Sequence, residues 1–464
     1  MINYFNFKKI SDGYLITNEL GRYAFISEDE FKILVNDEIT MDHKCFEELK
    51  EKYFIFDGPQ QDFIWNASRE MRRNKQYLGE ATQLFIFVVT TQCNLNCVYC
   101  QAKDTDTLKH GFMSKEVALK GLDIVFQSPS QDMTIEFQGG EPLLNFDVIQ
   151  DIVLEGEKRA QKEKRELHFS IVSNLMLLND QMIHFFKEHH IGISTSLDGH
   201  SKIHNINRHD FDGNGSFERV IKAIRLLQSE GISVGCIETT TKETLKYAKE
   251  LVDTYKKLNM HDIFIRPLTP LGVAKMKWDE IGYHQKDFIA FYSTCLQYII
   301  QLNKEGYDLR EGHASLFLER ILKGVTQNYM ELRSPCGASI GQMAIYYDGS
   351  IYTCDEGRMM AEMGEDLFKL GTIDNTYTQL VSGTTCKSLC AASVLESLPE
   401  CCDCVYHPYC GVCPVINYAL YHDIFATQSD HYRCQMYKGM LDVIFSILQK
   451  NKEDQEVLKR WVNL

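Results

Sequence analysis

Three cysteines lie close together in the stretch TTQCNLNCVYCQAK, where Cys93, Cys97 and Cys100 have the spacing C-x3-C-x2-C. A tetrahedral zinc site needs four ligands, and this motif lacks a fourth one nearby. A cubane iron–sulfur cluster anchored by three thiolates has one iron without a protein ligand. An open coordination position is what separates a catalytic metal site from a structural one, and a small molecule with an amine and a carboxylate could chelate that iron. The motif therefore favours a catalytic cluster.

A second group of cysteines lies near the C-terminus, where ten of the 16 cysteines fall between Cys336 and Cys434. In a reducing cytosol, such density indicates metal binding or catalysis rather than disulfides. The two thiol-rich regions predict soft-metal chemistry in two places. For the second region, a structural zinc ribbon built from Cys401 to Cys413 is the alternative.

Composition limits the partners that the chain can have. The 464 residues carry a formal charge of −15, which argues against nucleic acid or an anionic membrane as the main partner. The N-terminal residues do not resemble a signal peptide, and no run of about 18 apolar residues suggests a membrane span. We therefore expect a cytoplasmic protein.

The pattern of strands and helices predicts what positions the first cysteine motif. Apolar, strand-like runs occur at 84–90, 133–138, 168–173, 191–196, 232–239 and 262–267. Amphipathic helices lie between most of them, which predicts an α/β fold with a parallel sheet curled into a barrel or partial barrel. In such a sheet, chemistry lies at the C-terminal ends of the strands. The cysteine motif directly follows the first strand, so we expect it at the barrel mouth.

Other segments predict further domains. Residues 1–80 alternate short strand-like and helical stretches, as in a small α+β unit, and the polar stretch NASREMRRNKQYLGEATQ sets this unit apart. The expected divisions are 1–80 for this unit, 81–325 for the barrel, 326–440 for the cysteine-rich domain and 441–464 for a C-terminal helix.

The stretch CNLNCVYC resembles the signature of the radical S-adenosylmethionine (SAM) enzymes, whose fold is a partial (β/α)6 barrel. The resemblance implies that the methionine part of SAM chelates the open iron of a [4Fe–4S] cluster. It also implies that reduction of the cluster cleaves a C–S bond, and that the resulting 5′-deoxyadenosyl radical abstracts hydrogen from a substrate.

The stretch FQGGEPLLNF resembles the GGEP element of the same family, with Gly139, Gly140, Glu141 and Pro142. Glycines allow the backbone to approach a ligand closely. The resemblance implies that Glu141 offers an acceptor for the SAM ammonium group. Tyr99, between the second and third cysteines, matches the aromatic position beside the adenine.

Residues after later strands match family positions as well. The resemblance implies that Ser173 and Asn174 contact the SAM carboxylate or ribose. Ser196 and Asp198 match positions that face the ribose and the active site. Arg208 matches an arginine that pairs with the SAM carboxylate, for which a bidentate guanidinium is suited. For each of these polar residues, capping of a loop is the alternative role.

The second cysteine group resembles the SPASM extension of radical SAM enzymes, which holds two auxiliary [4Fe–4S] clusters. The positions carry over as Cys336, Cys354 and Cys413 for one cluster, and Cys401, Cys404, Cys410 and Cys434 for the other.

Two departures from the SPASM pattern stand out. The final gap of the second run is one residue shorter than usual, and no cysteine follows shortly after Cys336. Cys386 or Cys390 could supply the missing ligand, or an iron could stay open to bind substrate. Cys402 could also replace Cys401.

Asp355 directly follows a predicted cluster ligand in TCDEGR. In SPASM enzymes that oxidise a side chain, an aspartate at this place can act as a general base, and a dry pocket near clusters could tune its pKa for that work. A role in orienting the loop is the alternative.

Longer stretches resemble the His-Xaa-Ser-system radical SAM maturases (HxsB), among them TIEFQGGEPLLNFDVI, ISTSLDGHSKIHNINR and FIRPLTPLG. That resemblance implies modification of a ribosomally made precursor peptide, with a low-potential electron donor such as ferredoxin or flavodoxin. The N-terminal unit is similar in outline to the peptide-recognition domain of such maturases, to which a leader peptide adds as a strand.

The resulting hypothesis is a radical SAM enzyme that installs a crosslink or other oxidative modification in a peptide. One alternative is a sulfatase-type maturase that forms formylglycine. Another is an iron–sulfur redox sensor without catalytic activity, against which the residues that resemble SAM contacts argue.

Overall fold

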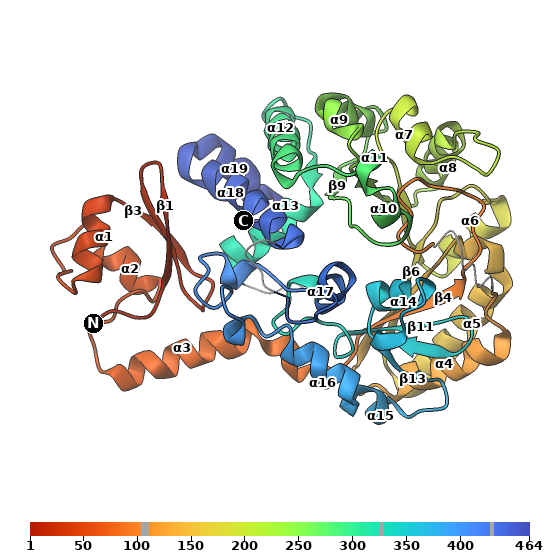
Figure 1. Ribbon diagram of the computed structural model, residues 1–464, viewed down its shortest axis with the longest axis horizontal. Helices are drawn as coiled ribbons and strands as arrows, with labels where there is room; N and C mark the ends of the chain where they lie inside the picture. The colour runs from red at the N-terminus through yellow and green to blue at the C-terminus, as the bar shows by residue number, and fades with distance from the viewer. Residues whose placement is uncertain (104–110, 325–328, 427–430) are drawn as a thin grey trace.

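The computed structural model describes residues 1–103, 111–324, 329–426 and 431–464. The expected boundary between residues 325 and 326 lies outside this part of the chain. Within it, the strands form two sheets, one of three strands and one of ten. Figure 1 shows the small sheet at one end of the molecule and the large sheet with its helices at the other.

The N-terminal unit is an antiparallel sheet backed by helices. Its strands are β1 (Asn6–Ile10), β2 (Gly13–Thr17) and β3 (Tyr23–Ile26), in the order β1-β2-β3. Its helices are α1 (Glu28–Val35), α2 (Phe46–Glu51) and α3 (Gln60–Asn74). The capping box of Ser27 and Glu30 fixes the start of α1.

The polar stretch that follows this unit is largely helical rather than an irregular connection. It forms most of α3, a helix without a fully buried residue, and α3 joins the N-terminal unit to the barrel (Figure 1). No face of α3 enters a core, since its apolar residues Phe63, Ile64 and Trp65 stay half-buried or exposed.

The ten-stranded sheet has the order β10-β9-β8-β7-β6-β5-β4-β11-β12-β13. Its strands are β4 (Leu84–Thr90), β5 (Asp132–Gly139), β6 (Glu166–Val172), β7 (Gly192–Ser196), β8 (Val234–Thr239), β9 (Asp262–Arg266), β10 (Arg310–Glu311), β11 (Gln342–Ile345), β12 (Ser350–Tyr352) and β13 (Lys369–Thr372). Strands β4 to β10 are parallel, as expected for a partial barrel. The structure adds four strands to the six that the sequence predicts. In particular, β11 pairs with β4, so that the cysteine-rich domain continues the barrel sheet.

Most helices of the barrel region cover the outer face of the large sheet, whereas Gly272–Met276 packs against the cysteine loop. The helices of this region are α4 (Lys115–Gln127), α5 (Phe146–Glu163), α6 (Asp180–Glu188), α7 (Ser201–Asn207), α8 (Phe217–Ser229), α9 (Ala248–Lys257), α10 (Gly272–Met276), α11 (Trp278–Ile281), α12 (Gln285–Lys304) and α13 (Gly312–Leu318). The cysteine-rich region has α14 (Asp355–Glu362), α15 (Tyr377–Ser382), α16 (Thr384–Ala391) and α17 (Pro414–Tyr421).

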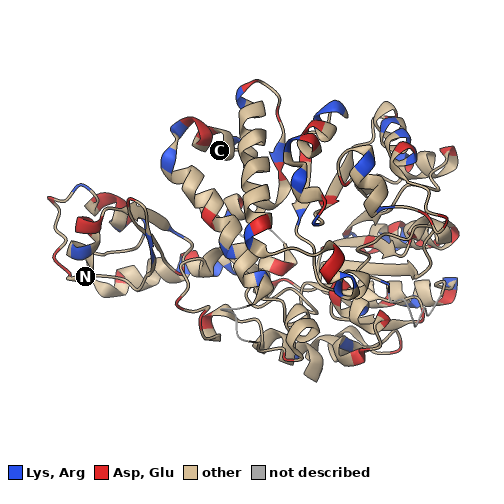
Figure 2. Ribbon diagram, turned by 45° about the horizontal axis from the view of Figure 1, so that its top comes forward, with Lys and Arg blue, Asp and Glu red and all other residues tan. Residues whose placement is uncertain are grey.

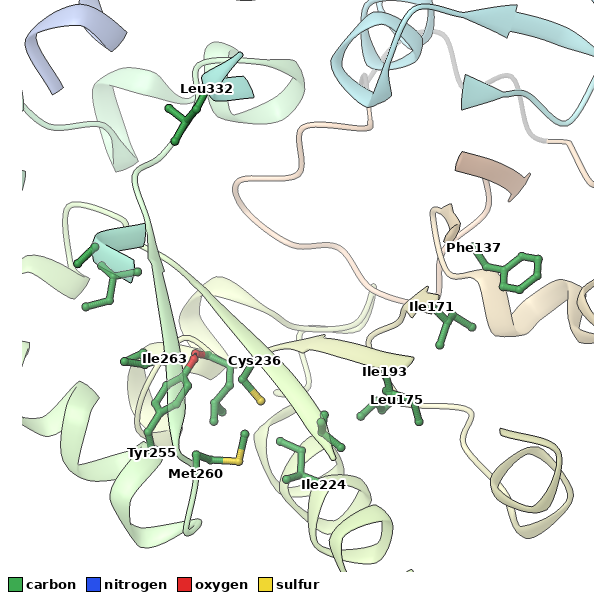
Figure 3. Close-up of a cluster of buried hydrophobic side chains, with 14 of the residues drawn as sticks. Phe137, Ile171, Leu175, Ile193, Ile224, Cys236, Tyr255, Met260, Ile263 and Leu332 are labelled. Carbon is green, nitrogen blue, oxygen red and sulfur yellow. The ribbon is translucent and has the colours of Figure 1, made fainter. Parts of the chain in front are cut away.

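Alternation along the strands separates the two faces of the sheet. In β5, Met133, Ile135 and Phe137 are fully buried toward the helices, whereas Glu136 and Gln138 are half-buried on the opposite face. Figure 3 shows Phe137 with other members of this core, among them Ile193 of β7 and Tyr255 of α9. The polar residues of the opposite face line the inside of the barrel.

The C-terminus is two helices rather than one. Helix α18 (Tyr432–Lys450) begins before the expected 441 and contains Cys434, and α19 (Lys452–Trp461) follows. The side chain of Asn451 accepts from the backbone N–H of Glu453 and caps α19. No helix in the described ranges is both long and apolar enough to cross a membrane.

Candidate active site at the barrel mouth

The loop of Cys93, Cys97 and Cys100 follows β4 and is held from two sides. The backbone N–H of Asn96 donates to the carbonyl of His209 (2.7 Å), and that of Val98 donates to the carbonyl of Asn207 (2.9 Å), at the end of α7. On the other side, Val273 N–H donates to the Cys100 carbonyl at 2.9 Å. The loop is therefore fixed at the C-terminal end of the parallel strands, as predicted.

The glycines of the GGEP element allow two loops to meet. Backbone N–H groups of Gly140 and Glu141 donate to the carbonyls of Thr90 (2.9 Å) and Gln92 (2.8 Å). A Cβ atom on Gly139, whose φ is +147°, would lie 2.0 Å from the Thr90 oxygen, and one on Gly140 would lie 2.2 Å from the Gln92 oxygen. No side chain fits at either position, so these glycines place the loop after β5 directly against the start of the cysteine loop.

Glu141 connects the loop that follows β5 to the loop that follows β6. Its fully buried carboxylate accepts from Ser173 Oγ (2.7 Å), Asn174 N–H (2.7 Å) and Leu143 N–H (3.0 Å). Asn174 in turn donates its side-chain N–H to Asn94 Oδ1 at 2.7 Å, beside Cys93. Buried Pro142 begins the short turn Pro142–Asn145. The assignment of these residues to SAM stays a prediction; their hydrogen bonds position the loops around it.

Tyr99, Asp198 and Arg208 form a buried hydrogen-bonded chain. The Tyr99 hydroxyl donates to Asp198 Oδ2 (2.6 Å) and accepts from Arg208 Nη1 (2.7 Å). Burial raises the pKa of the Asp198 carboxyl, and the Arg208 guanidinium opposes this shift. Arg208 Nε is buried without a hydrogen-bond partner, a donor that suits a carboxylate ligand. Ser196, at the end of β7, is half-buried and lies on the barrel-lining side of its strand.

The spacing of the thiols fits a cluster better than a single ion, and their protonation shows that they need a bound cation. Burial raises the pKa of Cys93 to about 12 and that of Cys97 to about 11, so these thiols stay protonated until a bound cation supplies positive charge. A tetrahedral zinc site would bring its thiolates to about 3.8 Å from one another, given Zn–S bonds of about 2.3 Å.

In the part of the chain that the structure describes, three or more candidate ligand atoms lie within 4.8 Å of one another only at exposed Asp132, Glu166 and His168. The three thiols of the catalytic loop are therefore more widely spaced than zinc requires. The same holds for the C-terminal thiols, which argues against the zinc ribbon. Wider spacing is what a polynuclear cluster needs, because each thiolate binds a different iron.

The structure brings the C-terminal cysteines into the two predicted groups. In the first, burial raises the pKa of Cys354, and Glu356 together with the thiols of Cys413 and Cys336 raises it further. We call the group of Cys336, Cys354 and Cys413 the first auxiliary site.

In the second group, burial and the thiols of Cys410, Cys434 and Cys404 raise the pKa of Cys401 to about 12. The thiol of the neighbouring Cys402 lies instead toward the N-terminal unit, close enough to Tyr4 for its charge to raise the pKa of that hydroxyl. This geometry favours Cys401 over Cys402 as a ligand.

Asp355 is engaged in an ion pair at the start of α14. Arg358 Nε donates to its Oδ1 at 2.8 Å, and the buried Arg358 also reaches Gln138 Oε1 on β5 at 3.4 Å. Asp355 therefore lies between the barrel interior and the first auxiliary site. Its role as a general base stays a prediction.

Sequence reasoning missed a polar pocket beside this aspartate. The pocket, which we call the mouth pocket, has a volume of about 40 Å³ and is lined by Phe264, Arg266, Leu268, His313, Tyr329, Glu331, Glu356, Ile416, Arg433, Met436 and Tyr437, among others. The position of Arg266 at the end of β9 was a usable signal, because strand ends carry the chemistry in such folds. His313 and Glu331 gave no local signal.

Charges in the mouth pocket are only partly paired. Arg433 Nη2 and Glu331 Oε2 form a close ion pair at 2.7 Å. Arg266 Nη2 lies 3.9 Å from Glu331 and 4.0 Å from Glu356, too far for a hydrogen bond. Both ring nitrogens of His313 are buried without a well-aligned hydrogen bond, and the Ile265 backbone is the polar group near the ring. Burial, with the charges of Glu331 and Asp355, raises the pKa of Glu356 to about 7. The pocket thus offers free hydrogen-bonding groups to a ligand.

Comparison with known proteins agrees with this geometry. Residues 87–258 match the sequence model of the Radical SAM superfamily. Residues 87–258 therefore form a radical SAM domain, in an enzyme whose cofactors are SAM and a [4Fe–4S] cluster.

Individual relatives share most of the chain. The radical SAM cyclopropyl synthase TigE of Paramaledivibacter caminithermalis is 23% identical, over 74% of this chain and 72% of its own. A cysteine-type anaerobic sulfatase-maturating enzyme of Clostridium novyi is 25% identical, over 71% of this chain and 87% of its own. SuiB of Streptococcus suis, solved with S-adenosylmethionine, has a TM-score of 0.56 at 16% identity, over 92% of this chain and 99% of its own. SuiB has also been solved with its precursor peptide SuiA.

Proposed function

We propose that this enzyme abstracts a hydrogen atom from a side chain of a ribosomally synthesised precursor peptide and so installs a crosslink or other oxidative modification. The observation that carries the proposal is the mouth pocket, which lies at the end of β9 and adjoins the first auxiliary site through Glu356. Relatives that act on peptides or proteins support it, as does the resemblance of several stretches to the His-Xaa-Ser-system maturases.

Arg266 connects the barrel interior to the mouth pocket. Its charge interacts with Glu331, Glu356 and Asp355 on the auxiliary side and with Glu136 inside the barrel. Because no carboxylate lies within hydrogen-bond distance of it among the described residues, its donors are free for a peptide carbonyl or side chain. The volume of about 40 Å³ suits the end of one side chain rather than a whole small molecule, so the rest of a peptide would lie outside.

The residues have distinct roles in this reaction. When bound, SAM and the reduced cluster at Cys93, Cys97 and Cys100 supply a 5′-deoxyadenosyl radical. Arg266 and His313 orient the substrate side chain, and Asp355 accepts the proton released as the substrate is oxidised. The C-terminal cysteines would hold auxiliary clusters that could take up the electron released with this proton, and a ferredoxin or flavodoxin would supply the reducing electron for the catalytic cluster.

The N-terminal unit would hold the leader of the peptide. One face of its sheet is covered by α1 and α2, through contacts such as Ile16 with Leu34. The other face packs on the cysteine-rich domain and α18, where Tyr23 lies 5.4 Å from Phe445 and Thr17 Oγ1 donates to the Val405 carbonyl at 2.7 Å. The free edges of β1 and β3 are then where a peptide strand can add.

Charge distribution agrees with a peptide rather than a polyanion as partner. Lysine and arginine alternate with aspartate and glutamate along the outer helices (Figure 2), and the chain as a whole is acidic. Binding through strand addition and a narrow pocket does not require a basic groove.

The test is anaerobic reconstitution with SAM, a reductant and peptides encoded near the enzyme, followed by mass spectrometry. We expect one peptide to lose two hydrogens. Arg266→Met should raise the KM for that peptide at least tenfold and leave peptide-independent SAM cleavage unchanged. Arg310→Met, which removes an exposed guanidinium beside Asp262, is the matched control. An Arg266→Met enzyme with an unchanged KM would contradict the pocket assignment.

A further inference from the structure

The first auxiliary site has three cysteines, and the structure narrows the choice of a fourth. Of the ten cysteines from Cys336 onward, seven fall into the two groups described above, which leaves Cys386, Cys390 and Cys402. The Cys402 thiol lies toward Tyr4 of the N-terminal unit. Only the two cysteines of α16 remain.

Helix α16 is tied to the first auxiliary site at its C-terminal end. The backbone N–H of Cys336 donates to Ser393 Oγ at 3.0 Å, and the same hydroxyl donates to the carbonyl of Leu389 at 2.7 Å. Leu389 is buried in one apolar cluster with Cys336, Cys354 and Cys413. The last turn of α16 therefore packs directly against the three thiols.

Spacing on the helix puts both cysteines of α16 on one face. Cys386 and Cys390 are four residues apart, one helical turn, and their thiols interact. Cys390 is the one in the last turn, and its thiol also lies close enough to that of Cys336 for their charges to interact. The Cys386 thiol, one turn earlier on the helix, contacts Ser339 rather than Cys336.

We propose that Cys390, on α16, is the fourth protein ligand of the first auxiliary cluster, so that each of its irons is bound by a protein thiolate. On binding, the Cys390 thiol gives up its proton to solvent and forms an Fe–S bond, without a change in oxidation state. The ligand that the SPASM pattern places shortly after Cys336 is thus replaced by one from a helix about fifty residues later in the chain. This cluster then transfers electrons and does not bind substrate through iron.

This inference rests on auxiliary clusters being present, and its test separates the two questions. The background is full-length protein with Cys93→Ala, Cys97→Ala and Cys100→Ala, which removes the catalytic cluster and its open iron. About eight irons per chain in this background would establish two auxiliary clusters of the [4Fe–4S] type. About four irons or none would refute two auxiliary clusters, and the Cys390 assignment with them.

Cyanide, which binds an iron that lacks a protein ligand, then tests whether the first auxiliary cluster has such an iron. In the background protein, the EPR spectrum of the reduced clusters should not change when cyanide is added, because every iron has a protein ligand. After Cys390→Ala, cyanide should shift one of the two cluster signals, and oxidation should release about one iron per chain. Cys386→Ala, on the same face of the same helix, is the matched control and should behave as the background.

Two results would overturn the assignment. A cyanide response in the background protein, with Cys390 intact, would show that an iron is open despite this thiol, and this measurement needs no substitution in α16. A response in Cys386→Ala but not in Cys390→Ala would move the ligand one turn along the helix.

Discussion

Replacing His313 with phenylalanine tests the physical character of the mouth pocket. The imidazole is 3% exposed, and its ring lies 5.2 Å from that of Phe264, 5.3 Å from Phe317 and 5.5 Å from Tyr437. A phenyl ring fits this aromatic cage. The substitution therefore removes two unpaired ring nitrogens without opening a cavity.

The expected change in the free energy of unfolding follows from the pKa of the buried imidazole. Burial lowers the pKa of His313 to about 4 from the ordinary value of 6.5. The unfolded chain therefore binds a proton that the folded chain refuses, and the stability of the wild type falls as the pH drops from 6.5 toward 4. Between pH 8 and pH 5.5, this linkage costs about 1.4 kcal/mol. His313→Phe removes that cost, and it also removes the desolvation of unpaired nitrogens, worth about 1–3 kcal/mol at any pH.

The assay is anaerobic denaturant unfolding of wild type and variant at pH 8 and pH 5.5. We expect the variant to be more stable at both, with the advantage larger by about 1.4 kcal/mol at pH 5.5. His184→Phe, on the exposed face of α6 where the side chain is 82% accessible, is the control for the change from imidazole to phenyl. The gain in stability should be accompanied by slower peptide modification, since the pocket loses a hydrogen-bonding group. Equal pH dependence in wild type and His313→Phe would refute the reasoning.

Three further predictions concern the cysteine sites. Gly140→Ala should displace the catalytic loop and lower iron content by up to about four atoms per chain, whereas Gly58→Ala, where a Cβ meets nothing within 4 Å, should not; iron analysis checks both. Tyr99→Phe should lower the free energy of unfolding by about 1–3 kcal/mol, because two buried charged groups lose its hydroxyl, and equal denaturation midpoints would argue against that hydrogen-bonded chain. Cys401→Ala should lose auxiliary iron and Cys402→Ala should retain it; the reverse order in an iron count would exchange their roles.

Local sequence signals were sufficient to predict where the cysteine loop lies in the fold. The cysteine spacing and the GGEP element each lie within one loop. The two glycines of that element are required because a Cβ atom would lie 2.0 Å or 2.2 Å from a backbone oxygen of the neighbouring loop. The six barrel strands were recognisable because each is an apolar run between amphipathic helices. These features depend on neighbours in sequence.

What the sequence did not show depends on tertiary contacts. Arg266, His313 and Glu331 come from three separate segments, and only the fold brings them into one pocket. The pairing of β11 with β4 is a contact between segments far apart in the chain, which periodicity cannot reveal. Helix α3 was not recognisable as a connecting helix because it buries no residue completely.

The central claim is that three thiolates leave one iron free for SAM. The most direct measurement is the yield of 5′-deoxyadenosine and methionine after reduction of anaerobically reconstituted protein with SAM present. The account predicts both products from the wild type, and none above background from the variant in which Cys93, Cys97 and Cys100 are alanine. Equal yields from the two proteins, or no cleavage by wild type that holds its full complement of iron, would contradict it.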